Sequence, residues 1–260
     1  MPSIRCLGFL AALLSLPLSH ADLPDVIDAI RPSIVGVGTT YPERQPIGDA
    51  RPNQLLGTGF AVGDGNLIAT SLHVLPELLD YENRQSLAVF VGRGRDAQVR
   101  EAEVVARDQD HDLALLRIQG SRLPALVLGD EDSVREGEMM VFTGFPIGAV
   151  LGLFTLTHQG IVSSIIPVAR TADNAADLTP AQLLRMRNPY DVFQLDAIAY
   201  PGNSGSPVYR QSNGEVIGVL NSVFVKESRE AVLEQPSGIS YAIPVIWLAR
   251  LIDRHSDLEN

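Results

Sequence analysis

The chain has 260 residues, of which 45% are hydrophobic and 20% charged, a composition typical of a globular protein with a sizeable buried core. Its formal net charge is −11, and the sequence contains no clustered basic stretch. Nucleic-acid binding is therefore disfavoured, because neutralising phosphates requires Lys and Arg side chains gathered on one surface.

The first 21 residues have the pattern of a secretory signal. Arg5 precedes an apolar run at 6–18, and Ser19-His20-Ala21 then places small residues where a signal peptidase reads them. The run is short and is interrupted by Pro17, so it is poorly suited to span a bilayer. We predict a signal peptide at 1–21 and a bacterial periplasmic or secreted protein, with a retained anchor as the alternative. No later segment has the length and apolarity of a membrane helix, so no membrane span is expected after signal removal.

Cysteine usage agrees with export. Cys6 is the only cysteine, so the mature chain can hold no disulfide, thiolate nucleophile or cysteine-ligated metal. An exported chain without disulfides suits a bacterial envelope better than an animal secretion. No group of His, Asp and Glu has ligand spacing outside the acidic stretch 108–112, so we predict neither a metal nor a cofactor.

Short apolar and β-branched segments bounded by glycine or proline dominate the rest of the chain. Many such segments with regular turn signals predict an all-β protein rather than βαβ units. The first set of expected strands covers 33–39, 57–62, 66–70, 87–91, 99–106 and 113–118. The second set covers 139–143, 155–166, 192–195, 207–209, 216–223 and 239–243.

Three helices are expected among these strands. The first, at 23–30, stops before Pro32. Thr179-Pro180-Ala181-Gln182 reads as a capping box with proline at the first helical position, which opens a helix at 179–187. The last helix, at 244–255, repeats its apolar residues at the spacing of one helical face, and we expect that face to lie on the β-structure.

The segment Gly202-Asn203-Ser204-Gly205-Ser206-Pro207 contains what an acyl-transfer nucleophile needs. Its glycines let the backbone turn tightly, so that two N–H groups can converge on one oxygen beside the serine hydroxyl. The same residue types also form ordinary surface turns. A catalytic serine needs a base and the base needs an orienting carboxylate, so the rest of the chain must decide between the two interpretations.

His73 is the best-placed base among the five histidines. It follows the strand-like segment 66–70, where a β-strand ends and the chain turns. A hydrogen-bonded structural histidine is the alternative interpretation of such a position. One histidine is lost with the signal, His255 lies near the C-terminus, and neither His111 nor His158 has a supporting motif.

The candidate acids lie in the stretch 108–112, which holds three aspartates in five residues. Such a stretch is usually a solvated loop, but Asp112 directly precedes the apolar segment 113–118. We therefore expect Asp112 alone to be drawn into the core. Its buried carboxylate would need a partner, which the imidazole of His73 could supply.

The order of these motifs resembles the chymotrypsin-fold serine peptidases and, more narrowly, the bacterial HtrA/Deg branch. The residues that carry this resemblance are Gly57-Thr58-Gly59-Phe60, Thr70-Ser71-Leu72-His73-Val74, 112–116, Gly144-Phe145-Pro146-Ile147-Gly148, Gly160-Ile161-Val162-Ser163, Gln194-Leu195-Asp196-Ala197, 202–205 and Ser240-Tyr241-Ala242-Ile243-Pro244. The match covers roughly residues 31–252, and several motifs occurring in order are far more specific than any one of them.

The resemblance implies an all-β fold of two packed six-stranded antiparallel β-barrels, at about 31–125 and 126–252, with a C-terminal helix. The active site would lie in the cleft between the barrels. His73, Asp112 and Ser204 would form the catalytic triad.

The resemblance also implies how substrate is held. The backbone N–H groups of Gly202 and Ser204 would form the oxyanion hole. Ile198, six residues before the nucleophile, would lie at the base of the primary substrate pocket, where an uncharged floor favours apolar P1 side chains. Polypeptides would be the substrates, and branch members often assemble as trimers, which leaves a homo-oligomer open.

The chain departs from the branch at several places, among them Leu72, which stands before His73 where small or polar residues are commoner. Ser206 replaces the usual second glycine of the nucleophile motif, but Pro207 favours extended backbone before it, so a serine should fit. The sequence stops at Asn260, so we expect no PDZ domain. The segment 167–191 is longer than expected. We interpret it as a surface insertion with a small helix, and a gate formed by 179–187 against the nucleophile loop is the alternative.

Two function classes follow. The favoured one is an exported serine endopeptidase acting in envelope protein quality control, and the alternative is a non-catalytic polypeptide-binding or scaffold protein on the same fold. Scaffolds need not keep an intact His73, Asp112 and Ser204, which favours the enzyme. A serine esterase of the α/β-hydrolase type is disfavoured, because its nucleophile elbow leads into a helix whereas 207–209 reads as a strand.

Overall fold

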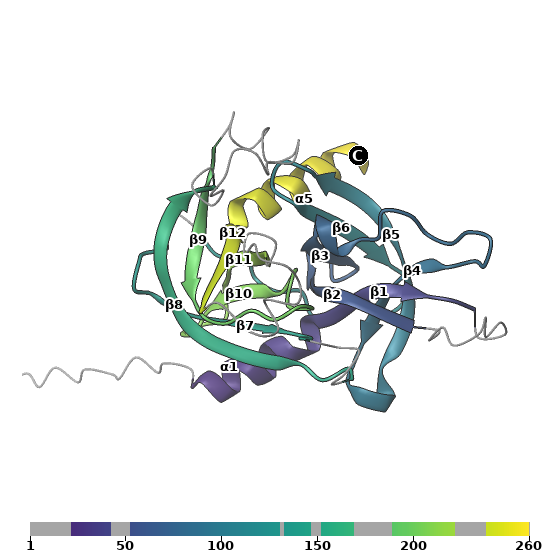
Figure 1. Ribbon diagram of the computed structural model, residues 1–260, viewed down its shortest axis with the longest axis horizontal. Coiled ribbons are helices and arrows are strands. Elements are labelled where there is room, and N and C mark those ends of the chain that lie inside the picture. Colours follow the sequence, from purple (N-terminus) through teal and green to yellow (C-terminus); the bar gives the residue numbers. More distant parts are fainter. Residues whose placement is uncertain are drawn as a thin grey trace, which may run out of the picture.

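The computed structural model describes residues 22–42, 53–130, 133–146, 152–168, 189–221 and 238–259. Within these ranges the chain is mostly β-strand, with helix α1 (Leu23–Ile30) near the start and helix α5 (Val245–Glu259) at the end. The strands form two closed six-stranded barrels that lie side by side in Figure 1, and the all-β prediction is confirmed. None of the helices in the described ranges is long and apolar enough to cross a membrane.

The first barrel contains the first six strands, hydrogen-bonded antiparallel in the order β1-β2-β3-β6-β5-β4. Their bounds are β1 (Ile34–Thr40), β2 (Asn53–Val62), β3 (Leu67–Ser71), β4 (Ser86–Val91), β5 (Gln98–Asp108) and β6 (Leu113–Ile118).

The second barrel contains the other six strands, also antiparallel, in the order β10-β11-β12-β9-β8-β7. Their bounds are β7 (Met139–Gly144), β8 (Leu156–Pro167), β9 (Asp191–Asp196), β10 (Pro207–Arg210), β11 (Val216–Asn221) and β12 (Ile239–Pro244).

The expected strands match the observed ones closely. The largest difference is at β2, which begins four residues earlier than expected, because β1 and β2 continue to pair beyond an irregularity at Val37/Gly38 as far as Thr40 opposite Asn53. The expected helix at 179–187, the proposed gate and the end of the expected strand 216–223 lie outside the described residues.

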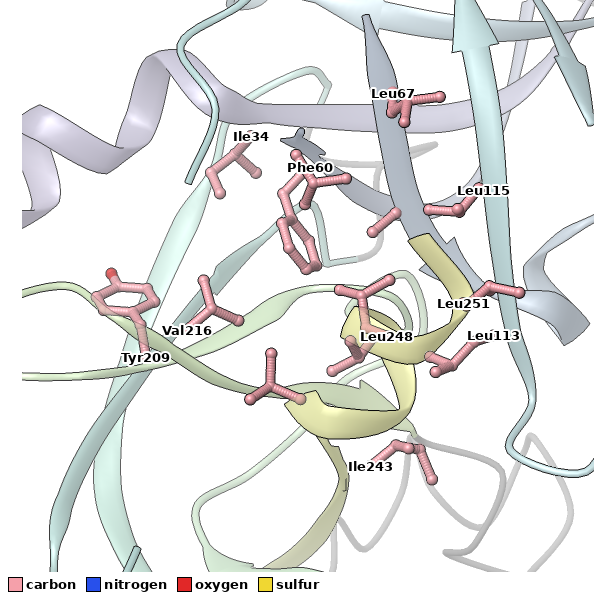
Figure 2. Close-up of a cluster of buried hydrophobic side chains, with 14 of the residues drawn as sticks. Ile34, Phe60, Leu67, Leu113, Leu115, Tyr209, Val216, Ile243, Leu248 and Leu251 are labelled. Carbon is pink, nitrogen blue, oxygen red and sulfur yellow. The ribbon is translucent and has the colours of Figure 1, made fainter. Parts of the chain in front are cut away.

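The largest hydrophobic cluster joins the two barrels instead of filling either one. Figure 2 shows Phe60 and Leu115 of the first barrel and Val216 of the second, with Leu248 of α5 among them. Two smaller clusters each lie within a single barrel. Helix α5 therefore packs its apolar face into the junction of the barrels, where the candidate site also lies.

Candidate active site

His73 and Asp112 are brought together by the pairing of β3 with β6. Ser71, the last residue of β3, lies opposite Leu113, the first residue of β6. The residues just beyond this pair must therefore be neighbours, and the N–H of Leu72 donates to the carbonyl oxygen of Asp112 at 2.9 Å. His73 follows within a single 3-10 turn, Leu72–Val74.

The carboxylate of Asp112 accepts three hydrogen bonds. His73 donates from its backbone N–H to Oδ1 at 2.9 Å, and its Nδ1 lies 2.5 Å from Oδ2. Asn221, at the end of β11, donates from Nδ2 to Oδ2 at 2.6 Å. Because an ionised carboxylate only accepts, Nδ1 of His73 carries the proton and Nε2 is left as the basic nitrogen.

Solvent reaches the two partners differently. The side chain of Asp112 is 9% exposed, whereas that of His73 is 27% exposed. The arrangement can therefore present a basic imidazole nitrogen to a reactant while a buried acid fixes the ring from behind.

Ser204 lies in the tight turn between β9 and β10 and is 5% exposed. The turn is held by two backbone bonds, from Asn203 N–H to the Tyr200 carbonyl and from Ser206 N–H to the Asn203 carbonyl, each 3.0 Å. Gly205 has φ +85°, and a Cβ on it would lie only 2.1 Å from the Thr58 carbonyl oxygen. Only glycine fits at that position.

Thr58 of β2 ties the nucleophile turn to the first barrel. Its N–H donates to the carbonyl oxygen of Ser204 at 2.9 Å, and its Oγ1 donates to the carbonyl oxygen of Gly202 at 2.7 Å. The same Oγ1 accepts from the N–H of Phe145 at 2.9 Å. The sequence signal for this role of Thr58 is a threonine between two glycines in a strand, and it does not by itself indicate a contact with the nucleophile turn.

The neighbouring strand β11 contacts Asp112 and the segments that carry His73 and Ser204. The Leu220 carbonyl oxygen accepts from Gly205 N–H in the nucleophile turn at 2.9 Å and from Ser71 Oγ, two residues before His73, at 3.2 Å. The next residue, Asn221, binds Asp112. The predicted base, acid and nucleophile thus gather at one junction, with Asp112 and His73 from the first barrel and Ser204 from the second.

The other predicted site residues flank this junction. Gly202, with φ +98°, shares the turn of Ser204. Ile198 follows β9 and is 36% exposed. Their assignments to an oxyanion hole and a substrate pocket stay predictions.

Ser206, the unusual residue of the nucleophile motif, is fully buried. Its hydroxyl occupies the space left by the missing side chain of Gly144, since a Cβ there would lie 2.1 Å from Ser206 Oγ. The serine is therefore accommodated by a glycine in the strand alongside.

The expectation that Asp112 alone of the three aspartates would be buried was wrong. Asp108 is also buried, at 8% exposure. Its carboxylate accepts from the backbone N–H of His111 at 3.1 Å, lies 2.9 Å from His111 Nδ1, and accepts from Arg254 of α5 at 2.9 Å. Burial alone would raise the pKa of Asp108, but the hydrogen bonds from His111 and Arg254 outweigh it and hold that pKa at about 2.

Comparison with known proteins places the chain in a family. A model of the trypsin-like peptidase domain matches residues 57–219. The chain belongs to the trypsin-like peptidase family. As a trypsin-like peptidase it also has the two-barrel architecture that the motifs implied, and this part of the prediction is confirmed.

The relatives of this trypsin-like peptidase support the narrower resemblance to the HtrA/Deg branch. A probable periplasmic serine endoprotease, DegP-like, of Halomonas elongata is 28% identical over 202 residues, which are 76% of this chain and 34% of the relative. A protein of the same description from Chlamydia trachomatis is 31% identical over 207 residues, 78% of this chain and 35% of that one. The chain thus spans about a third of the length of these relatives.

A solved structure, the HtrA-type protease AlgW with decapeptide, shares the fold. It superposes with a TM-score of 0.64 at 22% sequence identity, covering 91% of this chain and 68% of the other. Fold, family and the named relatives therefore agree with the resemblance drawn from the motifs.

Proposed function

We propose that the protein is an exported serine endopeptidase that cleaves polypeptides through an acyl-enzyme. The observation that carries this proposal is the pair of His73 and buried Asp112, with Nδ1 and Oδ2 2.5 Å apart, at the junction that also holds the turn of Ser204. Membership of the trypsin-like peptidase family supports it.

In the proposed reaction, Ser204 Oγ attacks the scissile carbonyl carbon while Nε2 of His73 takes the hydroxyl proton. Collapse of the tetrahedral intermediate breaks the C–N bond, and His73 returns the proton to the leaving amine. Water then repeats the sequence on the acyl-enzyme and releases the acid. Asp112 keeps the imidazole in the required tautomer and stabilises the imidazolium formed in each half.

The N–H groups of Gly202 and Ser204 would stabilise the negative oxygen of the intermediate. Thr58 supports this role indirectly, because it binds the carbonyl oxygens of these same two residues and so restrains the backbone immediately after each N–H donor. Donors of this kind are each worth about 10²–10³ in turnover in comparable enzymes.

We further propose an envelope location and a polypeptide substrate with an apolar P1 residue. The names of the DegP-like relatives and the signal pattern at 1–21 support the location. The exposed aliphatic side chain of Ile198, at the predicted pocket, supports the P1 preference. The boundaries 31–125 and 126–252 are our proposed limits for the barrels.

The test is hydrolysis of unfolded casein by the purified mature chain. We expect fragments from wild type and none above background from Ser204→Ala, while Ser121→Ala, an exposed serine in a loop of the first barrel, keeps wild-type turnover. Stable binding of casein without cleavage, equal in wild type and Ser204→Ala, would favour the scaffold protein instead.

A further inference from the structure

The short turn between β5 and β6 supplies the aspartate of two Asp–His pairs, of which the proposed triad uses only one. Asp112, at the end of the turn, binds His73. Asp108, at its beginning, binds His111, whose Nδ1 lies 2.9 Å from Oδ2 and 3.0 Å from Oδ1. His111 and Asp112 are consecutive residues joined by a peptide bond. A restraint on His111 therefore also limits the backbone conformations open to Asp112.

Helix α5, from the far end of the chain, covers the second pair. The ring of His111 stacks on that of Trp247, with centroids 3.7 Å apart and planes at 15°. Tyr190, which precedes β9, contacts the other rings, with its centroid 4.5 Å from His111 and 5.7 Å from Trp247. Arg254 of the same helix donates to Asp108 at 2.9 Å. Figure 1 shows α5 lying beside β5 and β6.

The turn needs such restraint because Asp112 has an unfavourable backbone. Its φ is +56°, in the left-handed region that residues with a Cβ seldom adopt, although aspartate enters it more readily than most. Such a conformation persists only when its surroundings fix it. From this backbone conformation the carboxylate of Asp112 reaches His73 and Asn221, so a change in the backbone of Asp112 would move the carboxylate away from both.

We propose that Asp108, His111 and Trp247 form a turn clamp through which helix α5 positions the catalytic acid. This inference rests on the proposed peptidase function. The three residues are positioning residues: His111 bridges the buried carboxylate of Asp108 and the indole of Trp247, and so holds the peptide that leads into Asp112. Helix α5, which follows the last strand of the second barrel, thereby fixes an acid that belongs to the first barrel.

The clamp predicts a loss of turnover without a loss of substrate binding. For His111→Ala and for Trp247→Leu we expect kcat to fall by about tenfold to a hundredfold, the cost of a slightly misplaced catalytic group, with KM within twofold of wild type. His111→Asn keeps a donor for Asp108 and should recover part of kcat. Gln109→Ala, an exposed residue of the same turn, is the matched control and should leave kcat unchanged.

The contact of His111 with Asp108 and the contact of His111 with Trp247 should also act as one unit. The double variant His111→Ala with Trp247→Leu should lose no more kcat than the worse single variant, because either change already releases the turn. Multiplied losses in the double variant, or variants that melt at lower temperature but retain wild-type kcat, would overturn the clamp.

A second readout does not depend on activity. In proton NMR, the Nδ1 proton between His73 and Asp112 should resonate far downfield and can be assigned by its absence in His73→Gln. We expect this signal to shift upfield or vanish in His111→Ala and to persist in Gln109→Ala. An unchanged signal in His111→Ala would refute the clamp even where peptidase activity stands, and a chain inactive on casein with a shifted signal would refute only the peptidase.

Discussion

At the scale of single residues, the candidate site depends on the hydrogen bonds that the carboxylate of Asp112 accepts. Two of its three donors belong to His73, and the third is the side-chain amide of Asn221, which reaches across from the second barrel. Sequence reasoning paired Asp112 with His73 as the predicted acid and base, because each lies beside a recognisable strand. It missed Asn221, because nothing near that residue in sequence indicates a contact with a residue 109 positions away.

Asn221→Ala should therefore reduce turnover. A hydrogen bond to a charged group contributes about 1.5–3 kcal/mol, so its loss should lower kcat/KM by roughly tenfold to a hundredfold if the bond orients the acid in the transition state. Steady-state hydrolysis of a peptide substrate measures the effect. A change of less than twofold would show that His73 alone orients Asp112.

Asp108 predicts a specific pH dependence of stability. Its folded pKa of about 2 lies below the ordinary aspartate pKa of 3.8, so its ionised form stabilises the fold above pH 4, and this stabilisation is lost as pH falls from about 4 to 2. The difference corresponds to about 2 kcal/mol. The free-energy gap between wild type and Asp108→Asn in urea unfolding should shrink by about that amount between pH 5 and pH 2. An equal gap at both pH values would contradict the assigned partners.

At the scale of elements, most of the fold could be predicted, since strand positions follow from local apolar patterns and turn residues. The start of β2 could not, because Asn53 is recruited by pairing with Thr40 beyond an irregular register. The burial of Asp108 could not be predicted from the sequence either. Its cover comes from Arg254, which is 146 residues away in sequence, and a run of aspartates gives no sign of such a partner.

Strand β2 fixes the nucleophile turn through Thr58, and Thr58→Val tests this connection. The variant keeps the shape of the side chain but leaves the Gly202 carbonyl and the Phe145 N–H without their partner atom. We expect a loss of about 1–3 kcal/mol in the free energy of unfolding, together with a lower kcat. Thr155→Val, just before β8, is the control and should change stability by less than about 0.5 kcal/mol. Equal stability of the two variants would remove Thr58 from this role.

At the scale of the whole molecule, the two barrels and α5 share one hydrophobic cluster, so they should unfold together. Leu248 is fully buried in that cluster, and Leu248→Ala should cost about 2–5 kcal/mol. Trp247 is the chain's single tryptophan and lies at the junction, so its fluorescence reports the unfolding. Val127→Ala, at a side chain 66% exposed, should cost little. Separate unfolding transitions for the two barrels would contradict a shared core.

The most direct test of the central claim is labelling of the native chain with a fluorophosphonate, followed by mass spectrometry to locate the adduct. The account predicts one adduct on Ser204, absent in Ser204→Ala and strongly slowed in His73→Ala, because the hydroxyl needs the histidine as its base. No adduct on Ser204, or labelling of Ser204 at the same rate in His73→Ala, would contradict a serine activated by His73 and Asp112.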